Sequence, residues 1–559
     1  MVFEKQKITL FLLVGAMILF IVTYSCILNR KNLKYIKHKV DRDFGKNPSD
    51  IKIDKKILKK LFENTVKGKY FLDDISANDI NLDLVFEKYN HANTTVGAQY
   101  LYMMLRMPIF NKEYHDKLKD VILKLSEDID AAKKLSVEFA KIGYFKRDVL
   151  DIIYDGIDYE RYKKYKIPVY ILTFSLVFLA VIYFVSKSFF GYSVIILLAC
   201  GIYVSLKMEK ATEGRILDFA TLADILQISK EIEKIHISIL KEDMEKVNKL
   251  NKDLSGIRRR TGQLSRFGTG SDVDFIIKIL DVLVMYTPRK FFKTAELINE
   301  NSEKLKDLYL VLGKMDAYLS LSSLYLSSDF TFAEYSTQKN ELIFEKLNHP
   351  LLDENQVSVD ADFTDINALI TGSNYSGKST FLRKIALATN LAMTIGFVPA
   401  KKYRTSFYFL QTSIDIKDSI EESISYFLAE TLTIKRMIEK SDIKKLLVLD
   451  EIFRGTNTID RISAACNTLK YLSKENKVFA ATHDIELTEL LKEEFKNYHF
   501  EEEIKDKDIT FDYKLKDGPS KTRNAIEILN IKGYPEEIIV GAKKMAEEIS
   551  RNKQIKYKF

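Results

Sequence analysis

The sequence predicts an α/β domain in the C-terminal part of the chain, preceded by a helical region with three transmembrane helices. Three observations support this prediction. A glycine-rich loop lies between an apolar strand and a helix-like segment, two further apolar strands end in polar residues, and three long runs of the chain are apolar. Strands that alternate with helical segments are typical of a parallel sheet.

The first element is the glycine-rich loop. Residues 372–379 read GSNYSGKS, a complete GxxxxGK[ST] pattern after the apolar strand Ile366 to Thr371. Such a loop opens a helix, where unpaired N–H groups and the helix dipole favour phosphate. In this pattern Lys378 reaches the β- and γ-phosphates, and Ser379 holds Mg²⁺. The sequence therefore predicts a bound nucleoside triphosphate, with ATP and Mg²⁺ as the cofactors. The predicted nucleotide-binding residues here are Gly372, Ser373, Asn374, Tyr375, Ser376, Gly377, Lys378, Ser379 and Thr380.

Two more strands carry polar residues to the same edge. Leu446 to Glu451 reads LLVLDE, an apolar run that ends in two carboxylates. Because the carboxyl ends of parallel strands share one edge, we expect Asp450 to coordinate Mg²⁺ and Glu451 to polarise the attacking water. The strand Lys477 to Ala481 (KVFAA) leads into His483, which we expect beside the γ-phosphate. The predicted catalytic residues are Glu451, His483 and Lys378, and the predicted metal ligands are Ser379 and Asp450.

These motifs, in this order, resemble the ATPase domain of the MutS family, a branch of the ABC ATPase superfamily. The similar segments are TGSNYSGKSTFLRK, FVPA, LDEIFRGTNTID and ATHDIELTEL. The resemblance implies an α/β P-loop NTPase domain of the ABC/MutS type, joined to an all-α core/lever domain. It also implies ATP hydrolysis by a homodimer that grips DNA as a clamp. Ser425, which begins the segment SYFLAE, holds the place of a serine that acts on the partner's nucleotide.

The resemblance extends to both sides of these motifs. Upstream, Phe71 to Pro108 is similar to the start of the family's core domain, with Thr95 and Gly97 in the expected places. The amphipathic stretches Ala211 to Leu250 and Asp272 to Leu326 are similar to its lever and core helices. Downstream, the residues around Tyr513 and Tyr534 resemble the final strand and helix-turn-helix.

The sequence also departs from the family. There is no room before Phe71 for a mismatch-reading domain with a Phe-x-Glu wedge or for a connector domain. The sequence Phe332-Ala333-Glu334 lies in a different context, so specific recognition of mismatches by this wedge is not expected. Nor does the stretch Leu351 to Ala361 hold an aromatic residue that could stack on adenine.

Three apolar runs predict membrane helices. Ile8 to Leu28 is uncharged and would form a helix of about 31 Å, the thickness of a bilayer core. Ile167 to Val185 and Phe189 to Leu206 would form a helical hairpin. Lysines and arginines flank all three runs on the sides that this topology places inside. We therefore expect a multi-pass protein of the cell membrane, with the lipid bilayer as a partner, its N-terminus outside and its ATPase domain in the cytoplasm.

Both membrane interpretations have alternatives. The first run could instead be a cleaved signal peptide. The hairpin could instead be a buried pair of core helices, because its runs are near the lower length limit for spanning. The expected domains are an N-terminal transmembrane helix (1–28), a first core/lever part (29–166), a transmembrane hairpin (167–206), a second lever/core part (207–330) and the ATPase domain (331–559).

Composition adds a few constraints. The chain has 559 residues with a net charge of +8, and 86 basic against 78 acidic residues form a mixed surface rather than a nucleic-acid stripe. The three cysteines predict no disulfide framework. One basic cluster, in a predicted glycine-broken loop, could contact DNA or lipid phosphates, although a solvated loop is the simpler interpretation. The cluster consists of Arg258, Arg259, Arg260 and Arg266.

Two other functions stay open at this point. An ABC transport motor would share the nucleotide-binding motifs, but the chain lacks an LSGGQ motif and three membrane helices are few for a transport pathway. A membrane scaffold or remodelling ATPase would keep the nucleotide site without binding DNA.

Overall fold

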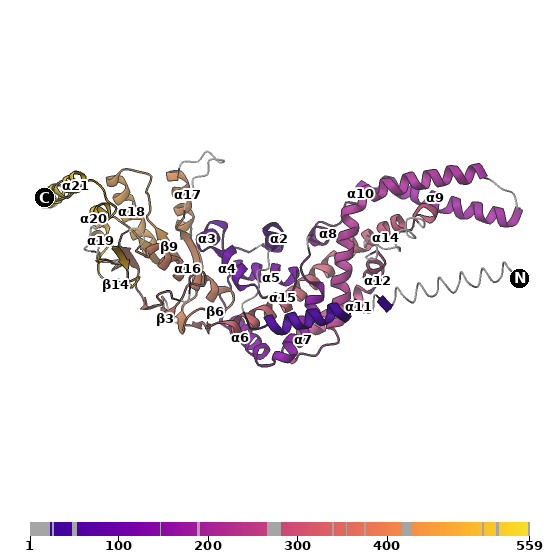
Figure 1. Ribbon diagram of the computed structural model, residues 1–559, viewed down its shortest axis with the longest axis horizontal. Helices are drawn as coiled ribbons and strands as arrows, with labels where there is room; N and C mark the ends of the chain where they lie inside the picture. Colours follow the sequence, from indigo (N-terminus) through magenta and orange to yellow (C-terminus); the bar gives the residue numbers. More distant parts are fainter. Residues whose placement is uncertain are drawn as a thin grey trace. The chain divides into compact units, whose positions relative to one another are not determined.

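The computed structural model describes residues 23–556 apart from gaps at 25–26, 29, 47–52, 67, 146, 187–190, 265–280, 338–339, 354, 374–375, 416–425, 506–507 and 521–524. The chain divides into two compact units (Figure 1). Unit 1 comprises Met1–Val66, Tyr89–Met103 and Asp120–Ser327, and unit 2 comprises Lys67–Lys88, Met104–Lys119 and Ser328–Phe559. The chain thus passes between the units several times.

Unit 1 is helical in its described part. A helix covers residues 30–43, and the others are α2 (Lys55–Thr65), α5 (Thr95–Arg106), α6 (Lys112–Glu127), α7 (Ile129–Ile142), α8 (Leu150–Tyr154), α9 (Tyr159–Ser186), α10 (Gly191–Ile232), α11 (Lys241–Asp253), α12 (Ser255–Leu264), α14 (Tyr286–Glu300) and α15 (Ser302–Ser327). The last residues of α5 and the first half of α6 belong to unit 2. The core helix is α15, which is buried along most of its length.

A buried carboxylate joins α15 to the start of α5. Asp316, fully buried on α15, accepts hydrogen bonds from the main-chain N–H groups of Asn93 and Thr94 and from both of their side chains. These bonds satisfy the exposed donors at the N-terminus of α5 and compensate the burial of the charge. A Cβ atom at Gly97 would lie 2.2 Å from Asp316 Oδ2, so this turn of α5 requires glycine.

The expectation of three transmembrane helices is wrong. Among the described residues, no helix is both long enough and apolar enough to cross a membrane. The second and third predicted spans fall in α9 and α10, which pack against each other and against α14 and α12. Val169 of α9 is fully buried, and Thr173 Oγ1 donates to the main-chain oxygen of Val284 over 3.2 Å. Part of their apolar surface therefore holds the helices of unit 1 together.

The same finding corrects the predicted location. The first predicted span, Ile8 to Leu28, lies outside the described residues except for residues 23, 24, 27 and 28. The absence of a spanning helix from the described chain contradicts a multi-pass protein of the cell membrane with an outside N-terminus. The lipid bilayer as a partner loses its support with it.

Unit 2 is built on a six-stranded sheet with the order β14-β11-β5-β10-β9-β8. Its five longer strands run parallel, and only β14 is antiparallel. The predicted strands before the phosphate loop, before the carboxylate pair and before His483 are therefore confirmed as neighbours in one sheet. The strands are β5 (Ala368–Thr371), β8 (Phe409–Ser413), β9 (Lys445–Asp450), β10 (Lys477–Ala481), β11 (Lys496–His499) and β14 (Lys516–Asp517).

Helices cover both faces of this sheet, as its nearly continuous apolar strands require. On one face, Leu447 and Leu449 of β9 pack in one cluster with residues of α17 (Tyr426–Ile438) and α18 (Thr458–Ser473). α16 (Lys378–Thr394) packs on the sheet as well, and its Phe381 lies near Phe363, whose ring meets that of Phe479 edge-on at 4.9 Å. The sheet therefore lies buried between two helical layers.

Smaller elements complete unit 2. A second sheet has the order β2-β7-β3-β4, β1 pairs with β6, and β12 pairs with β13. Their bounds are β1 (Thr331–Phe332), β2 (Glu334–Tyr335), β3 (Leu342–Leu347), β4 (Val359–Asp362), β6 (Phe397–Val398), β7 (Lys402–Thr405), β12 (Glu502–Lys505) and β13 (Asp508–Phe511). The remaining helices are α3 (Asp74–Asp79), α4 (Leu82–Tyr89), α19 (Glu486–Leu490), α20 (Ala525–Ile531) and α21 (Glu536–Lys556).

The structure also places the Phe332-Ala333-Glu334 segment and most of the arginine cluster. The segment Phe332-Ala333-Glu334 runs through β1 and β2, and the Phe332 ring packs on Phe397 at 5.6 Å. The Phe332 side chain is therefore part of the packing between β1 and β6. The arginine cluster, in contrast, is not in a loop: Arg258, Arg259 and Arg260 lie on α12, and Arg266 is outside the described residues.

We predict that Gly97→Ala lowers the free energy of unfolding of unit 1 by about 1–3 kcal/mol, because the added methyl group cannot avoid Asp316 without moving α5 from α15. Urea unfolding followed by far-UV circular dichroism measures this change. Gly256→Ala on α12 is the matched control, since nothing lies within 4 Å of its Cβ position. Equal midpoints for the two variants would contradict the steric argument.

Candidate functional site

The register of the sheet brings the predicted residues to one edge. Ala481 at the end of β10 is paired with Ile370 of β5 on one side and with Asp450 of β9 on the other. The strands β5, β9 and β10 therefore end at the same level of the sheet. The glycine-rich loop, Glu451 and the segment of His483 follow these strand ends side by side.

The glycine-rich loop is shaped by two residues with positive φ. Gly372 has φ 143° and Gly377 has φ 105°, values that disfavour any side chain. Lys378 begins α16, and its buried Nζ donates to the main-chain oxygens of Gly372 and Ser373, both at 2.7 Å. The ammonium group thus lies inside the loop, beside the N-terminus of a long helix. Asn374 and Tyr375 lie outside the described residues.

Ser379 and Asp450 lie in direct contact. The Ser379 hydroxyl donates to Asp450 Oδ2, while Asp450 Oδ1 is buried and has no hydrogen-bond partner among the described residues. Burial raises the pKa of Asp450, against the hydrogen bond from Ser379. A hydroxyl and a carboxylate with a free oxygen are hard donors of the kind that Mg²⁺ takes when nucleotide phosphates supply further ligands. These residues therefore fit Mg²⁺.

Glu451 has a different environment from its neighbour. Its backbone has φ 52°, which turns the side chain out of the strand direction. Oε1 lies 2.8 Å from His483 Nε2, and Oε2 pairs with Arg454. Burial tends to raise the pKa of Glu451, but the His483 hydrogen bond and the charges of Arg454 and Lys378 outweigh it and lower the pKa. Glu451 is therefore a carboxylate at neutral pH and can accept a proton or a hydrogen bond from water.

Two side chains that the sequence did not single out fix this region. Glu430 of α17 is buried, and its carboxylate accepts the main-chain N–H of Phe453, which has φ 63°. It thereby holds the tight turn that follows Glu451. Arg461 of α18 forms two hydrogen bonds with Asp484, at 2.9 and 2.7 Å, and so anchors the residue next to His483.

A cavity of about 390 Å³ opens beside the phosphate loop. Tyr513, Phe381 and Phe500 contribute aromatic rings to its wall, whereas the stretch Leu351 to Ala361 holds none. A Cβ at Gly377 would lie 3.0 Å from the Tyr513 ring, so this ring borders the loop directly. The cavity is lined by Leu352, Asp353, Asn355, Gln356, Val357, Val359, Gly377, Thr380, Phe381, Lys384, Phe500 and Tyr513. Its position and its rings suit the base and ribose of a nucleotide whose phosphates lie on the loop.

Of the predicted site residues, Ser425 lies outside the described residues. The helix that follows it, α17, carries the exposed apolar residues Phe427, Leu428 and Leu432. Ile459, near the start of α18, is 77% exposed. Apolar side chains thus remain uncovered on the two helices that border the site.

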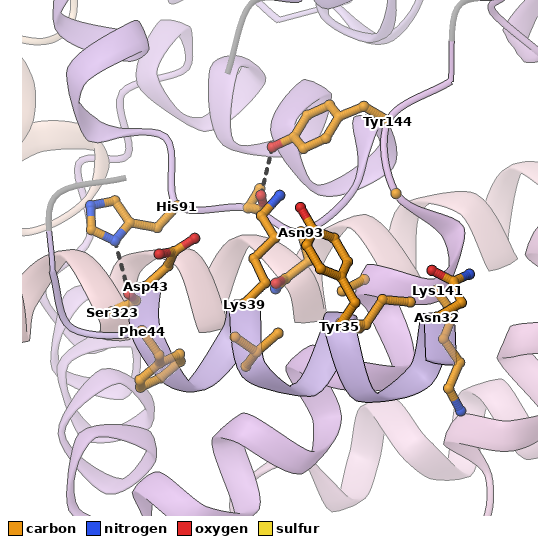
Figure 2. Close-up of a pocket in the computed structure, with 15 residues that line it drawn as sticks. Asn32, Tyr35, Lys39, Asp43, Phe44, His91, Asn93, Lys141, Tyr144 and Ser323 are labelled. Carbon is orange, nitrogen blue, oxygen red and sulfur yellow. Dashed lines mark hydrogen bonds between the residues drawn. The ribbon is translucent and has the colours of Figure 1, made fainter. Parts of the chain in front are cut away.

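A second cavity, of about 300 Å³, lies in unit 1 between the helix of residues 30–43 and the chain around His91 (Figure 2). His91 Nδ1 and Ser323 Oγ are 2.8 Å apart, and Tyr144 donates its hydroxyl to Ala92 O over 2.5 Å. The cavity contains none of the predicted site residues.

Comparison with known proteins agrees with this geometry. Residues 368–550 match the family model of MutS domain V. The DNA mismatch repair protein MutS of Aquifex pyrophilus is 33% identical over 268 residues, which are 46% of this chain and 31% of that protein. The MutS proteins of Clostridium tetani and of Clostridium botulinum (strain Okra) are 28% identical over 299 residues and 29% identical over 280 residues.

The similarity is partial on both sides. It covers 51% and 47% of this chain for the two clostridial relatives, and 34% and 30% of their own lengths. The chain therefore spans about a third of the length of the curated relatives that it matches. What these relatives do as whole proteins is thus not carried over by the match alone.

Proposed function

The chain is a member of the MutS family through its domain V, and from this premise we propose that it is a Mg²⁺-dependent ATPase. The observation that carries the proposal is the common edge of β5, β9 and β10, where the phosphate loop, the Ser379–Asp450 contact and the Glu451–His483 pair meet. A nucleotide, a metal and a water each have a matching set of groups at this edge.

The loop and Lys378 would bind the phosphates. The N-terminus of α16 offers main-chain N–H groups, and the Lys378 ammonium group can exchange its two carbonyl acceptors for phosphate oxygens. Ser379 and Asp450 would hold Mg²⁺, which neutralises charge on the β- and γ-oxygens when it is bound. Tyr513 would stack on the base in the adjoining cavity.

Glu451 would orient the water that attacks the γ-phosphate. Its lowered pKa keeps it ionised, and the hydrogen bond with His483 fixes the direction of the carboxylate. Arg454 pairs with the other carboxylate oxygen. Each carboxylate oxygen can accept a second hydrogen bond, so Glu451 can hold the water while His483 and Arg454 stay in place.

We propose that the functional form is a homodimer in which Ser425 of one copy acts on the nucleotide of the other. The support is the family resemblance of the SYFLAE segment and the exposed apolar residues on α17 and α18. Such residues beside a site are typical of a surface that another chain covers. The output would be the gripping and release of DNA, which the family resemblance implies; the matched relatives are named DNA mismatch repair proteins.

We predict that Lys378→Ala weakens ATP binding by at least about 30-fold, because the phosphate loop loses the cation that lies inside it.

Glu451→Gln keeps the shape of the side chain, binds ATP within about threefold of the unmodified protein, and lowers kcat by about 10²- to 10⁴-fold. Equilibrium binding of ATP and phosphate release measure the two effects. Normal turnover by the Glu451 variant would refute its role.

Tyr513→Ala is expected to weaken nucleotide binding by about 5- to 150-fold, the equivalent of one lost base stack. Tyr513→Phe keeps the ring and is expected to bind as the unmodified protein does. Titration with a fluorescent ATP analogue measures both. Tyr534→Ala is the control, because this tyrosine is also exposed but lies in the turn between α20 and α21. If Tyr513→Ala binds the analogue as tightly as the control does, the Tyr513 ring is not part of the binding site.

DNA binding is tested by gel shift with homoduplex, mismatched and branched DNA, each with and without ATP. We expect retarded complexes whose stability falls steeply with salt, as for any protein that neutralises phosphates. Phe332→Ala is expected to change the affinity for mismatched and matched DNA equally, because this ring is packed on Phe397. Absence of any shift at low salt would leave the ATPase without a DNA ligand.

A further inference from the structure

The short helix α3 belongs to unit 2 although it lies far from the ATPase motifs in the sequence. It packs along the free side of β8, the edge strand next to β9. The main-chain N–H of Thr412 donates to Ser76 Oγ at 3.1 Å on that side, and the main-chain oxygen of Thr412 accepts from Arg436. Side chains thus provide the hydrogen-bond partners that a further strand would otherwise give to the main chain of Thr412 at this sheet edge.

Asp79, the last residue of α3, holds the end of β8. Its carboxylate accepts hydrogen bonds from Thr412 Oγ1 at 2.6 Å and from the main-chain N–H groups of Ile414 and Asp415, both at 2.9 Å. Asp79 is only 2% exposed. Hydrogen bonds from main-chain donors to a buried carboxylate are strong and directional. They fix the path of the chain as it leaves the strand.

This path runs beside the metal ligand. In the parallel pairing of β8 with β9, Ser413 is level with Leu449, so Ile414 follows at the level of Asp450. Arg383 adds a link to the helix that starts with Lys378. Its Nε donates to the main-chain oxygen of Asp79 at 3.0 Å, and its Nη2 pairs with Asp415 at 2.9 Å.

We infer that Asp79 is a positioning residue for ATP hydrolysis, which holds residues 412–415 against β9 so that Asp450 and Glu451 keep their places at the nucleotide edge. The inference rests on the proposed ATPase function. It adds that a residue of the segment Lys67–Lys88, far from the ATPase motifs in the sequence, affects the rate of the reaction without touching the nucleotide. Asp79 therefore acts on kcat rather than on nucleotide affinity.

Asp79→Asn tests this inference, because the amide keeps the size of the side chain but places N–H groups against main-chain donors. The first measurement is hydrogen–deuterium exchange in the peptide that contains Ile414 and Asp415, which is expected to accelerate. The second is steady-state ATP hydrolysis, in which kcat is expected to fall about tenfold or more while KM changes by less than about twofold.

Asp442→Asn is the matched control. Asp442 pairs with Lys69 at 2.6 Å. This ion pair also joins the segment Lys67–Lys88 to the rest of unit 2, but near the amino end of β9. This variant is expected to leave kcat, KM and the exchange of residues 412–415 unchanged. An equal loss of kcat in both variants would mean that general docking of the segment matters and would overturn the role of Asp79.

Other outcomes are equally decisive. Unchanged kcat, or a raised KM with normal kcat, in Asp79→Asn overturns the inference. If the unmodified protein does not hydrolyse ATP, the proposed function fails, while unchanged exchange at Ile414 and Asp415 separately refutes the positioning contact. If Asp79→Asn does not fold, Ser76→Ala removes one acceptor of the same set. It is expected to lower kcat less, with KM again unchanged, and normal kcat in this variant would refute the proposal.

Discussion

The parallel pairing of β10 with both β5 and β9 is the constraint on which the rest of unit 2 depends. It sets Ile370, Ala481 and Asp450 level, so that three segments far apart in the sequence end at one edge. A shift of one residue in either pairing would turn the side chains of a strand to the opposite face. The same shift would separate Ser379 from Asp450 and His483 from Glu451. The chemistry at the edge therefore relies on a register that the apolar core specifies.

The two adjacent acids show how this edge gives similar groups different properties. Asp450 is largely buried against the start of α16, and burial raises its pKa. Glu451, one residue later, has left the strand with a positive φ and meets His483 and Arg454, which lower its pKa. A carboxylate with an unpartnered buried oxygen suits a metal, whereas an ionised carboxylate held by a histidine suits a water. The change of backbone direction between them is what separates the two roles.

The sequence predicted the parts of the site that local patterns encode. The phosphate loop, Asp450, Glu451 and His483 each follow an apolar strand, and the structure brings them together as expected. It did not reveal Asp79, whose bond to Thr412 joins residues 333 positions apart. The membrane prediction failed because no described helix, α9 and α10 included, is both long enough and apolar enough to cross a membrane, and part of their apolar surface packs on α12 and α14.

Buried charges also mark the two ends of the central strands. At the amino end of β9, Lys445 Nζ donates to the main-chain oxygens of Met437 and Glu439, at the C-terminal end of α17. At the amino end of β10, Lys477 Nζ donates to three main-chain oxygens. Burial lowers the pKa of Lys477 to about 7, yet three carbonyl acceptors match the three N–H bonds of an ammonium group and favour the charged form. At the carboxyl ends, the buried charges are Asp450 and Asp79. Buried lysines therefore lie at the amino ends of β9 and β10, whereas buried aspartates lie at the carboxyl ends of β8 and β9. Of these aspartates, Asp450 presents a buried carboxylate oxygen that suits a metal. The candidate site lies at the carboxyl edge, where the buried Asp450 oxygen without a hydrogen-bond partner in the described chain meets Ser379 at the start of α16.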